Sequence, residues 1–176
     1  MIEFRYFNDV EKNAALTKNA CDPGHSGPFL DGNFFNNDFE DQGVCLDCLV
    51  KGRKRVKVDG YLKSKISKHV GNQADRAKII AGLERTPPVP WIQNNDWPFC
   101  DADAMQYRGE HSVEKRFADK EFDFTPAKLW SILDENSRAQ AGDPQSLLDA
   151  VADGLAACFI FRCLHCGRFE AVCQSY

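Results

Sequence analysis

Apolar side chains recur at helical spacing in the middle of the chain. Leu62, Ile66 and Val70 lie four residues apart, and a similar spacing resumes a few residues later. This periodicity places apolar side chains on one helix face, where a core can cover them. It predicts helices over about 61–70 and 73–84.

The residues at their first turns predict two later helices. Thr125-Pro126 and Asp143-Pro144 each join a side chain that caps a helix to a proline, which fits the first helical position. Both dipeptides precede apolar residues at helical spacing. We expect these helices to bury Leu129, Trp130, Ile132, Leu133, Leu147, Leu148, Val151 and Leu155.

Alternating apolar positions predict strands at both ends of the chain. In residues 3–7, a strand would place Phe4 and Tyr6 on one face and Arg5 on the other, and 159–163 and 169–173 resemble the arms of a closing β-hairpin. No repeat or Ser/Gly-rich linker divides the chain. The pattern therefore predicts an α+β fold, one small mixed domain over 1–176 that ends in a hairpin region, 157–176.

Residues 21–44 lack any such periodicity. They are rich in Gly, Asn and Asp, which favour turns, yet five large apolar side chains are interspersed among them. A long irregular loop is uncommon in a compact domain unless a bound group or a function holds it. We therefore look for a cross-link within this segment.

Eight cysteines in 176 residues supply candidates for such a cross-link. Four of them form two Cys-x-x-Cys pairs, Cys45 with Cys48 and Cys163 with Cys166, and Gly167 follows the second pair. This spacing lets both sulfurs reach one tetrahedral Zn²⁺, so each pair provides half of a structural zinc site.

Cys21 and His25 are the nearest residues that can complete the first pair. A zinc ion held by these four side chains would pin the irregular segment 21–48. For the second pair, Cys100 is the strongest candidate, with Cys173 and His165 as weaker ones.

A single four-cysteine site built from both Cys-x-x-Cys pairs is the other arrangement. The spacing is compatible with one zinc ion or with two. Neither pair lies in a clear β-α-β setting, which argues against a redox role.

The start of the chain, 1–10, lacks the basic and apolar pattern of a secretory signal. We therefore expect a cytoplasmic protein with reduced thiols, in which Cys158 and Cys173 are plain buried cysteines. The longest apolar run, 155–161, is too short to span a bilayer, so no membrane association is expected.

Charge is strongly segregated although the net charge is only −4. Residues 51–85 hold eleven basic and three acidic residues, whereas both flanking regions are acidic. A basic block can bind phosphates, so a nucleic-acid-binding zinc module that uses 51–68 is one hypothesis. The acidic flanks favour instead a basic protein partner, and the negative net charge argues against nucleic acid.

A set of short motifs resembles the CbrC family over nearly the whole chain and in the same order. The most specific parts are the Arg-Thr-Pro motif that leads to two tryptophans and the closing Cys-Leu-His-Cys-Gly. The motifs are Phe4-Arg5-Tyr6, Cys45-x-x-Cys48 with Gly52, Arg85-Thr86-Pro87 with Trp91 and Trp97, Cys100-Asp101 with Gly109, and Phe161 to Gly167.

The resemblance implies a bacterial, cysteine-rich protein associated with colicin tolerance and with immunity against toxins, and it implies no enzymatic activity. Two positions depart from the family pattern. Cys21 and His25 stand where the family has a Cys-x-x-Cys, and Ala104 stands where it has a further cysteine. The resemblance implies that the second site has lost a ligand or recruits Asp103 or Cys173.

The sequence carries no motif of an established catalytic class; Glu110 and His111 adjoin each other without a nucleophile. We therefore predict a non-catalytic immunity protein that binds and neutralises a bacterial toxin, with a nuclease as one candidate class. Acidic side chains can steer association with a basic cleft. The candidate contact residues are Asp31, Asp38, Glu40 and Asp41 in one segment, and Asp96, Asp101 and Asp103 in another.

Overall fold

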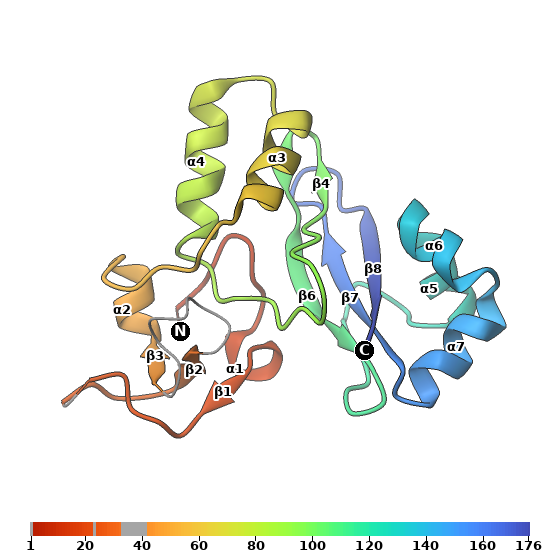
Figure 1. Cartoon of the computed structure of the whole chain (residues 1–176), viewed down its shortest axis with the longest axis horizontal. Helices are drawn as coiled ribbons and strands as arrows, with labels where there is room; N and C mark the ends of the chain where they lie inside the picture. The colour runs from red at the N-terminus through yellow and green to blue at the C-terminus, as the bar shows by residue number, and fades with distance from the viewer. Residues whose placement is uncertain (1, 23, 33–41) are drawn as a thin grey trace. The chain divides into compact units, whose positions relative to one another are not determined.

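The computed structural model describes residues 2–22, 24–32 and 42–176. Figure 1 labels its helices and strands. Its contacts divide the chain into two compact units. The first unit comprises 1–90 together with 102–104, and the second comprises 91–101 together with 105–176. The fold mixes helices with antiparallel sheets and ends in a β-hairpin, as the pattern predicts.

The first unit begins with a turn where the alternation predicts a strand. Phe4 and Phe7 form an isolated bridge, and the helix α1 (Val10–Asn13) follows at once. The predicted strand over 3–7 is therefore wrong. Phe4, Tyr6 and Phe7 are all buried, and a turn can bury all three whereas a strand would direct Tyr6 and Phe7 to opposite faces.

A small antiparallel sheet gives order to part of the irregular segment. It has the order β1-β2-β3, and it leads directly into the short helix α2. Leu30 and Val44 face each other across the sheet and are fully buried. The elements are β1 (Leu16–Thr17), β2 (Phe29–Asp31), β3 (Gly43–Cys45) and α2 (Leu46–Val50).

The two predicted helices of the first unit are confirmed. They are α3 (Gly60–His69) and α4 (Gln73–Leu83), which pack against each other. Asp59 and Asn72 cap their first turns with side-chain oxygens that accept backbone N–H groups. The apolar face of α3 is buried as expected.

The second unit is built on a three-stranded antiparallel sheet with the order β6-β7-β8. Its hairpin confirms the sequence prediction and is longer than predicted. The strands are β6 (Gln106–His111), β7 (Ala156–Arg162) and β8 (Phe169–Ser175); the short strands β4 (Phe99–Cys100) and β5 (Asp103–Ala104) precede them in the chain.

Both faces of β7 are covered. Three helices bury Cys158 and Ile160 on one face, whereas Phe159 and Phe161 pack against Trp91 on the other. This double coverage explains why six consecutive residues of β7 are buried. The helices are α5 (Pro126–Ile132), α6 (Glu135–Ala141) and α7 (Pro144–Ala152).

The capping prolines do mark the starts of α5 and α7. Thr125 and Asp143 accept backbone N–H groups of the first turns, and each helix begins at its proline. Leu155 is an exception among the predicted core residues, because it is 60% exposed. Since α7 ends at Ala152, Leu155 no longer follows the helical period.

Cys158 and Cys173 are not plain thiols. They stand directly opposite each other on β7 and β8, with their Cα atoms 4.0 Å apart, and they form a disulfide. The prediction of two unpaired buried cysteines is therefore wrong. Facing positions of an antiparallel pair direct both side chains to the same face, which brings the sulfurs together.

Within the part of the chain that the structure describes, no helix has both the length and the apolar character needed to cross a membrane.

Candidate metal centres

The first candidate centre gathers Cys21, His25, Cys45 and Cys48, all within the first unit. Cys45 ends β3 and caps α2, where its sulfur accepts the N–H of Cys48. The three sulfurs are almost completely buried, and the His25 side chain is 28% exposed. The irregular segment thus brings one sulfur and one imidazole to the start of α2.

The distances in this centre match a tetrahedral metal site. Nδ1 of His25 lies 3.5 Å from Sγ of Cys45 and 3.5 Å from Sγ of Cys48. A tetrahedral zinc ion at about 2.3 Å from sulfur and about 2.0 Å from nitrogen would separate these atoms by about 3.5 Å. These three side chains are therefore spaced as ligands of one ion, and the sulfur of Cys21 lies within 4.8 Å of each of their ligand atoms.

Burial and neighbouring sulfurs disfavour the charged form of the Cys48 thiol. Burial, together with contacts to Cys45 and Cys21, raises the pKa of Cys48 to about 12. Several thiolates can share so small a volume only if a cation compensates their charge. A divalent metal ion would supply that charge.

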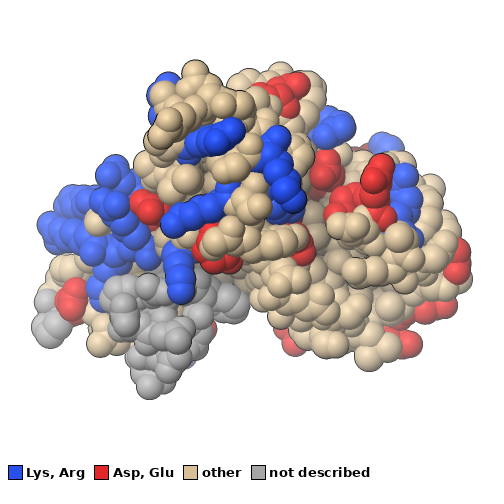
Figure 2. All heavy atoms as spheres, turned by 45° about the horizontal axis from the view of Figure 1, so that its top comes forward, with Lys and Arg blue, Asp and Glu red and all other residues tan. Residues whose placement is uncertain are grey.

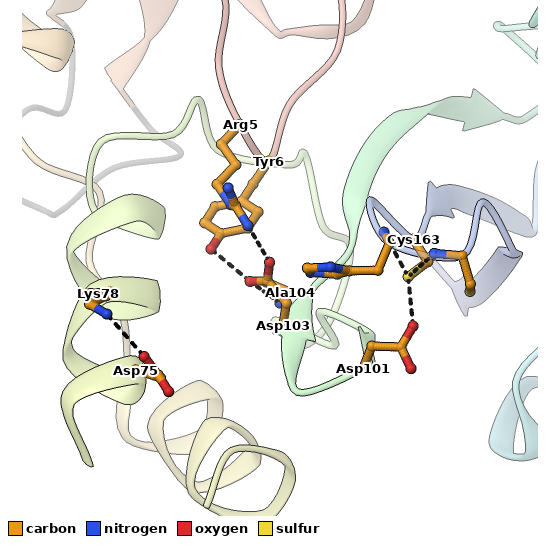
Figure 3. A network of polar contacts seen from close by, with 10 residues as sticks. Arg5, Tyr6, Asp75, Lys78, Asp101, Asp103, Ala104 and Cys163 are labelled. Atoms are coloured by element: carbon orange, nitrogen blue, oxygen red, sulfur yellow. Dashed lines mark hydrogen bonds and ion pairs between the residues drawn. The ribbon is translucent and has the colours of Figure 1, made fainter. Parts of the chain in front are cut away.

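The second candidate centre gathers Cys100, Asp101, Cys163 and Cys166 within the second unit. Cys100 ends β4, Asp101 follows it, and the two other cysteines flank the turn of the β7-β8 hairpin. Figure 3 shows the Asp101 carboxylate directed at the sulfur of Cys163. Gly167 has a φ of 75°, which few other residues adopt, and so closes the turn.

This centre also has the edge lengths of a tetrahedron. Sγ of Cys100 lies 3.7 Å from Sγ of Cys166, and Oδ2 of Asp101 lies 3.6 Å from Sγ of Cys100. The same oxygen lies 3.7 Å from Sγ of Cys163. Zinc–sulfur distances of about 2.3 Å would give about 3.8 Å between sulfurs and about 3.5 Å from sulfur to oxygen.

The pKa values of Cys163 and Cys100, two cysteines of the second centre, are shifted in opposite directions. Burial acts to raise the pKa of Cys163, but N–H groups of Cys166 and His165 stabilise the thiolate, and the result is a lowered pKa. For Cys100, burial and the neighbouring sulfurs raise the pKa to about 12, and the charge of Arg168 opposes this shift.

The structure therefore brings together all seven residues that the spacing nominates as ligands, in two groups. Each Cys-x-x-Cys pair is completed by side chains of its own unit, which favours two separate sites over one four-cysteine site. Cys173 is bonded to Cys158 and does not join the second group. Asp101 joins it instead, a role that its position next to Cys100 could have suggested.

Asp103 is a buried structural residue and neither a ligand nor an exposed contact. It is 7% exposed, and its carboxylate accepts hydrogen bonds from Arg5 at 2.6 Å and from Tyr6 at 2.8 Å (Figure 3). Its predicted roles as a recruited ligand and as a partner contact are therefore wrong. Burial and this hydrogen bond raise the pKa of Tyr6, which stays neutral.

The other candidate contact residues fall into three cases. Asp31 lies on β2 and is half-buried, whereas Asp96 is half-buried and accepts a hydrogen bond from Gln174 at 3.1 Å. Asp101 is exposed and belongs to the second centre. The remaining candidates, Asp38, Glu40 and Asp41, lie outside the described residues.

Lys and Arg side chains crowd one side of the face drawn in Figure 2. The basic segment, 51–57, follows α2, and four of its five cationic side chains are exposed. Gly52 lies at its start with a φ of 67°, and a Cβ there would lie 3.3 Å from Nε of Arg85 and 3.6 Å from Nε of Arg55. Two guanidinium groups therefore converge on this turn.

Neither the curated proteins nor the solved structures include a match to this chain. A family model does match, and it covers residues 1–174, both units included. The chain belongs to the uncharacterised protein family UPF0167.

Proposed function

We propose that this chain is a non-catalytic binding protein that two zinc ions hold in shape. The observation that carries the proposal is the pair of four-residue groups, each spaced like a tetrahedral site. Thiolate and imidazole ligands favour zinc over hard cations such as magnesium or calcium. Zinc bound in the first unit would order a segment whose described residues form two short strands, β2 and β3.

The absence of catalysis is supported by the ligand sets. While all four protein donors stay bound, a zinc ion has no vacant position at which it could activate a water molecule. Glu110 and His111, the acid–base pair considered from the sequence, have structural contacts: Glu110 pairs with Lys115 at 3.2 Å, and His111 accepts the N–H of Phe117.

We propose further that the binding partner is a bacterial toxin and that the protein acts as its immunity protein in the cytoplasm. The support is the resemblance of the sequence motifs to the CbrC family and the segregation of charge along the chain. Of the candidate acidic contacts, Asp31 and Asp96 are the described residues that neither the second centre nor the buried network occupies.

The zinc proposal predicts a stoichiometry. The purified protein should contain two zinc ions per chain by elemental analysis. Cys45→Ser and Cys163→Ser should each contain one, because each removes a ligand of a different group. Asp47→Ala and His165→Ala change residues inside the same Cys-x-x-Cys turns and should retain two. Wild-type protein with one metal ion or none would refute two centres.

The immunity proposal predicts protection from a toxin encoded beside its gene. Co-expression of the wild-type chain should restore growth of cells that produce this toxin. Asp31→Lys and Asp96→Lys should weaken protection, whereas reversal of Arg53, Lys54 and Arg55 to glutamate should leave it intact. Unchanged protection by both aspartate variants would contradict the acidic contact surface.

Nucleic-acid binding by the basic segment is the second candidate function. The convergence of Arg55 and Arg85 on Gly52 favours it, since adjacent guanidinium groups bind phosphates well. In this case the triple glutamate variant should abolish a salt-sensitive binding to nucleic acid, and it should do so with both zinc ions still bound. The same variants thus separate the two functions.

A further inference from the structure

The two centres differ in their exposure to solvent. In the first, all three cysteines are at most 3% exposed. In the second, Cys163 is 1% exposed, but Cys166 and Asp101 are exposed and Cys100 is half-buried. The second centre is therefore more open to solvent than the first, and Asp101 is one of its two exposed members.

Asp101 is also weakly fixed in its position. Among the described residues, its carboxylate contacts the sulfurs of Cys100 and Cys163 and has no other hydrogen-bond donor. Metal ligands are normally held in place by further hydrogen bonds, which orient them and strengthen the site. A metal ion would thus be the main group that holds this carboxylate.

The chemistry of the ligand set favours replacement of the oxygen. The carboxylate is a hard donor, whereas the other three ligands are soft thiolates. A zinc ion with three thiolate ligands binds a fourth thiolate more favourably than a carboxylate. Nη2 of Arg162 lies 3.5 Å from the place of a Cβ on Gly167, so a cationic side chain lies beside this turn and would attract an anionic donor.

We propose that the second centre has one exchangeable position, where an external thiolate replaces Asp101. The metal–oxygen bond breaks, one metal–sulfur bond forms, the thiol proton passes to solvent, and no atom changes oxidation state. The inference rests on the proposed zinc sites and gives the second one a task in binding. The thiolate comes from a small thiol or from a cysteine side chain of a partner.

Cobalt provides the test, because the intensity of its sulfur-to-metal charge-transfer band follows the number of bound thiolates. Protein loaded with two Co²⁺ ions has six thiolate ligands in the two groups. Addition of 2-mercaptoethanol should raise the band by about one sixth, the share of one new sulfur. A Gly-Cys-Gly peptide tests a protein side chain, and Gly-Ser-Gly is its control.

The two probes separate the sources of the thiolate. A response to 2-mercaptoethanol and to the cysteine peptide supports an open position that any thiol can reach. A response to the peptide alone assigns the position to a protein partner. No response to either, with two cobalt ions bound, overturns the inference and leaves the proposed metal sites intact. Fewer than two bound ions refutes the proposed sites themselves.

Asp101→Asn tests the residue itself. Asp101 has a φ of 51°, a conformation that asparagine tolerates well, so the variant should fold. The neutral amide is a weaker ligand, and a chelator should remove one of the two metal ions about 10-fold faster than from the wild type. Asp47→Asn, beside the first centre, is the matched control and should keep the wild-type rate. An unchanged rate in Asp101→Asn would show that Asp101 is not a ligand.

Discussion

Asp103 shows how one residue can look like a surface acid and yet be part of the interior. It stands two positions from Asp101, in a short acidic stretch that indicates an exposed contact. In the structure it anchors Arg5 and Tyr6, which lie almost one hundred residues earlier. The burial of Tyr6, at 3% exposed, makes this acceptor necessary.

Removal of this acceptor should destabilise the protein. Asp103→Ala leaves the hydroxyl of Tyr6 buried without a partner, and we expect a loss of about 2 kcal/mol in the free energy of unfolding. Arg5 contributes little, because its side chain is 59% exposed. Urea denaturation of zinc-loaded protein measures the loss.

Two further variants test this account of Asp103. Tyr6→Phe in the Asp103→Ala background should recover part of the stability, since no unpaired hydroxyl remains. Asp123→Ala is the control, because its carboxylate is 85% exposed and its removal should change stability by less than about 0.5 kcal/mol. Full stability of Asp103→Ala, combined with lost protection from a toxin, would restore the contact role.

At the scale of elements, the sequence predicted those helices whose positions are determined by residues close to one another in the chain. The capping residues fixed the starts of α5 and α7, and apolar periodicity located α3 and α4 within a residue or two. The helix α6 could not be predicted in this way, because its sequence has no apolar face. β1 and β2 are only two and three residues long, too short for any alternation to appear.

The candidate centres were predictable to the extent that spacing determines them. The two Cys-x-x-Cys turns and their nearest partners could be identified from separation along the chain alone. The disulfide and the place of Asp101 could not, because both depend on which residues face each other after folding. Cys173 illustrates this limit: its strand register places it opposite Cys158.

At the scale of the whole molecule, each unit contains its own core and its own candidate centre. The family model spans both units, so the two units occur together in the sequence pattern of this family. The sequence predicts that the two units form one domain. If they do, loss of the metal from one centre should destabilise both units together, and if they do not, it should destabilise only the unit that contains this centre. Metal removal from one centre is the appropriate perturbation.

Hydrogen exchange of the Cys45→Ser variant provides this measurement. We expect amide protection to fall in β2, β3 and α2, whose residues surround the first centre, and to persist in β7 and β8. Cys163→Ser should reverse the pattern, with losses near the hairpin turn. His165→Ala is the control and should keep wild-type protection in both units. Equal loss throughout both units in either cysteine variant would show a single cooperative domain.

The β7-β8 hairpin restricts insertions and deletions in its own sequence. Its turn carries two sulfurs of one centre, and its arms carry a pair of cysteines that face each other. A slip of one residue between the arms would send every inward side chain of one strand outward. It would also separate the facing cysteines and shift the arms relative to the turn. Insertions or deletions of a single residue within either arm should therefore be rejected, even where many substitutions are accepted.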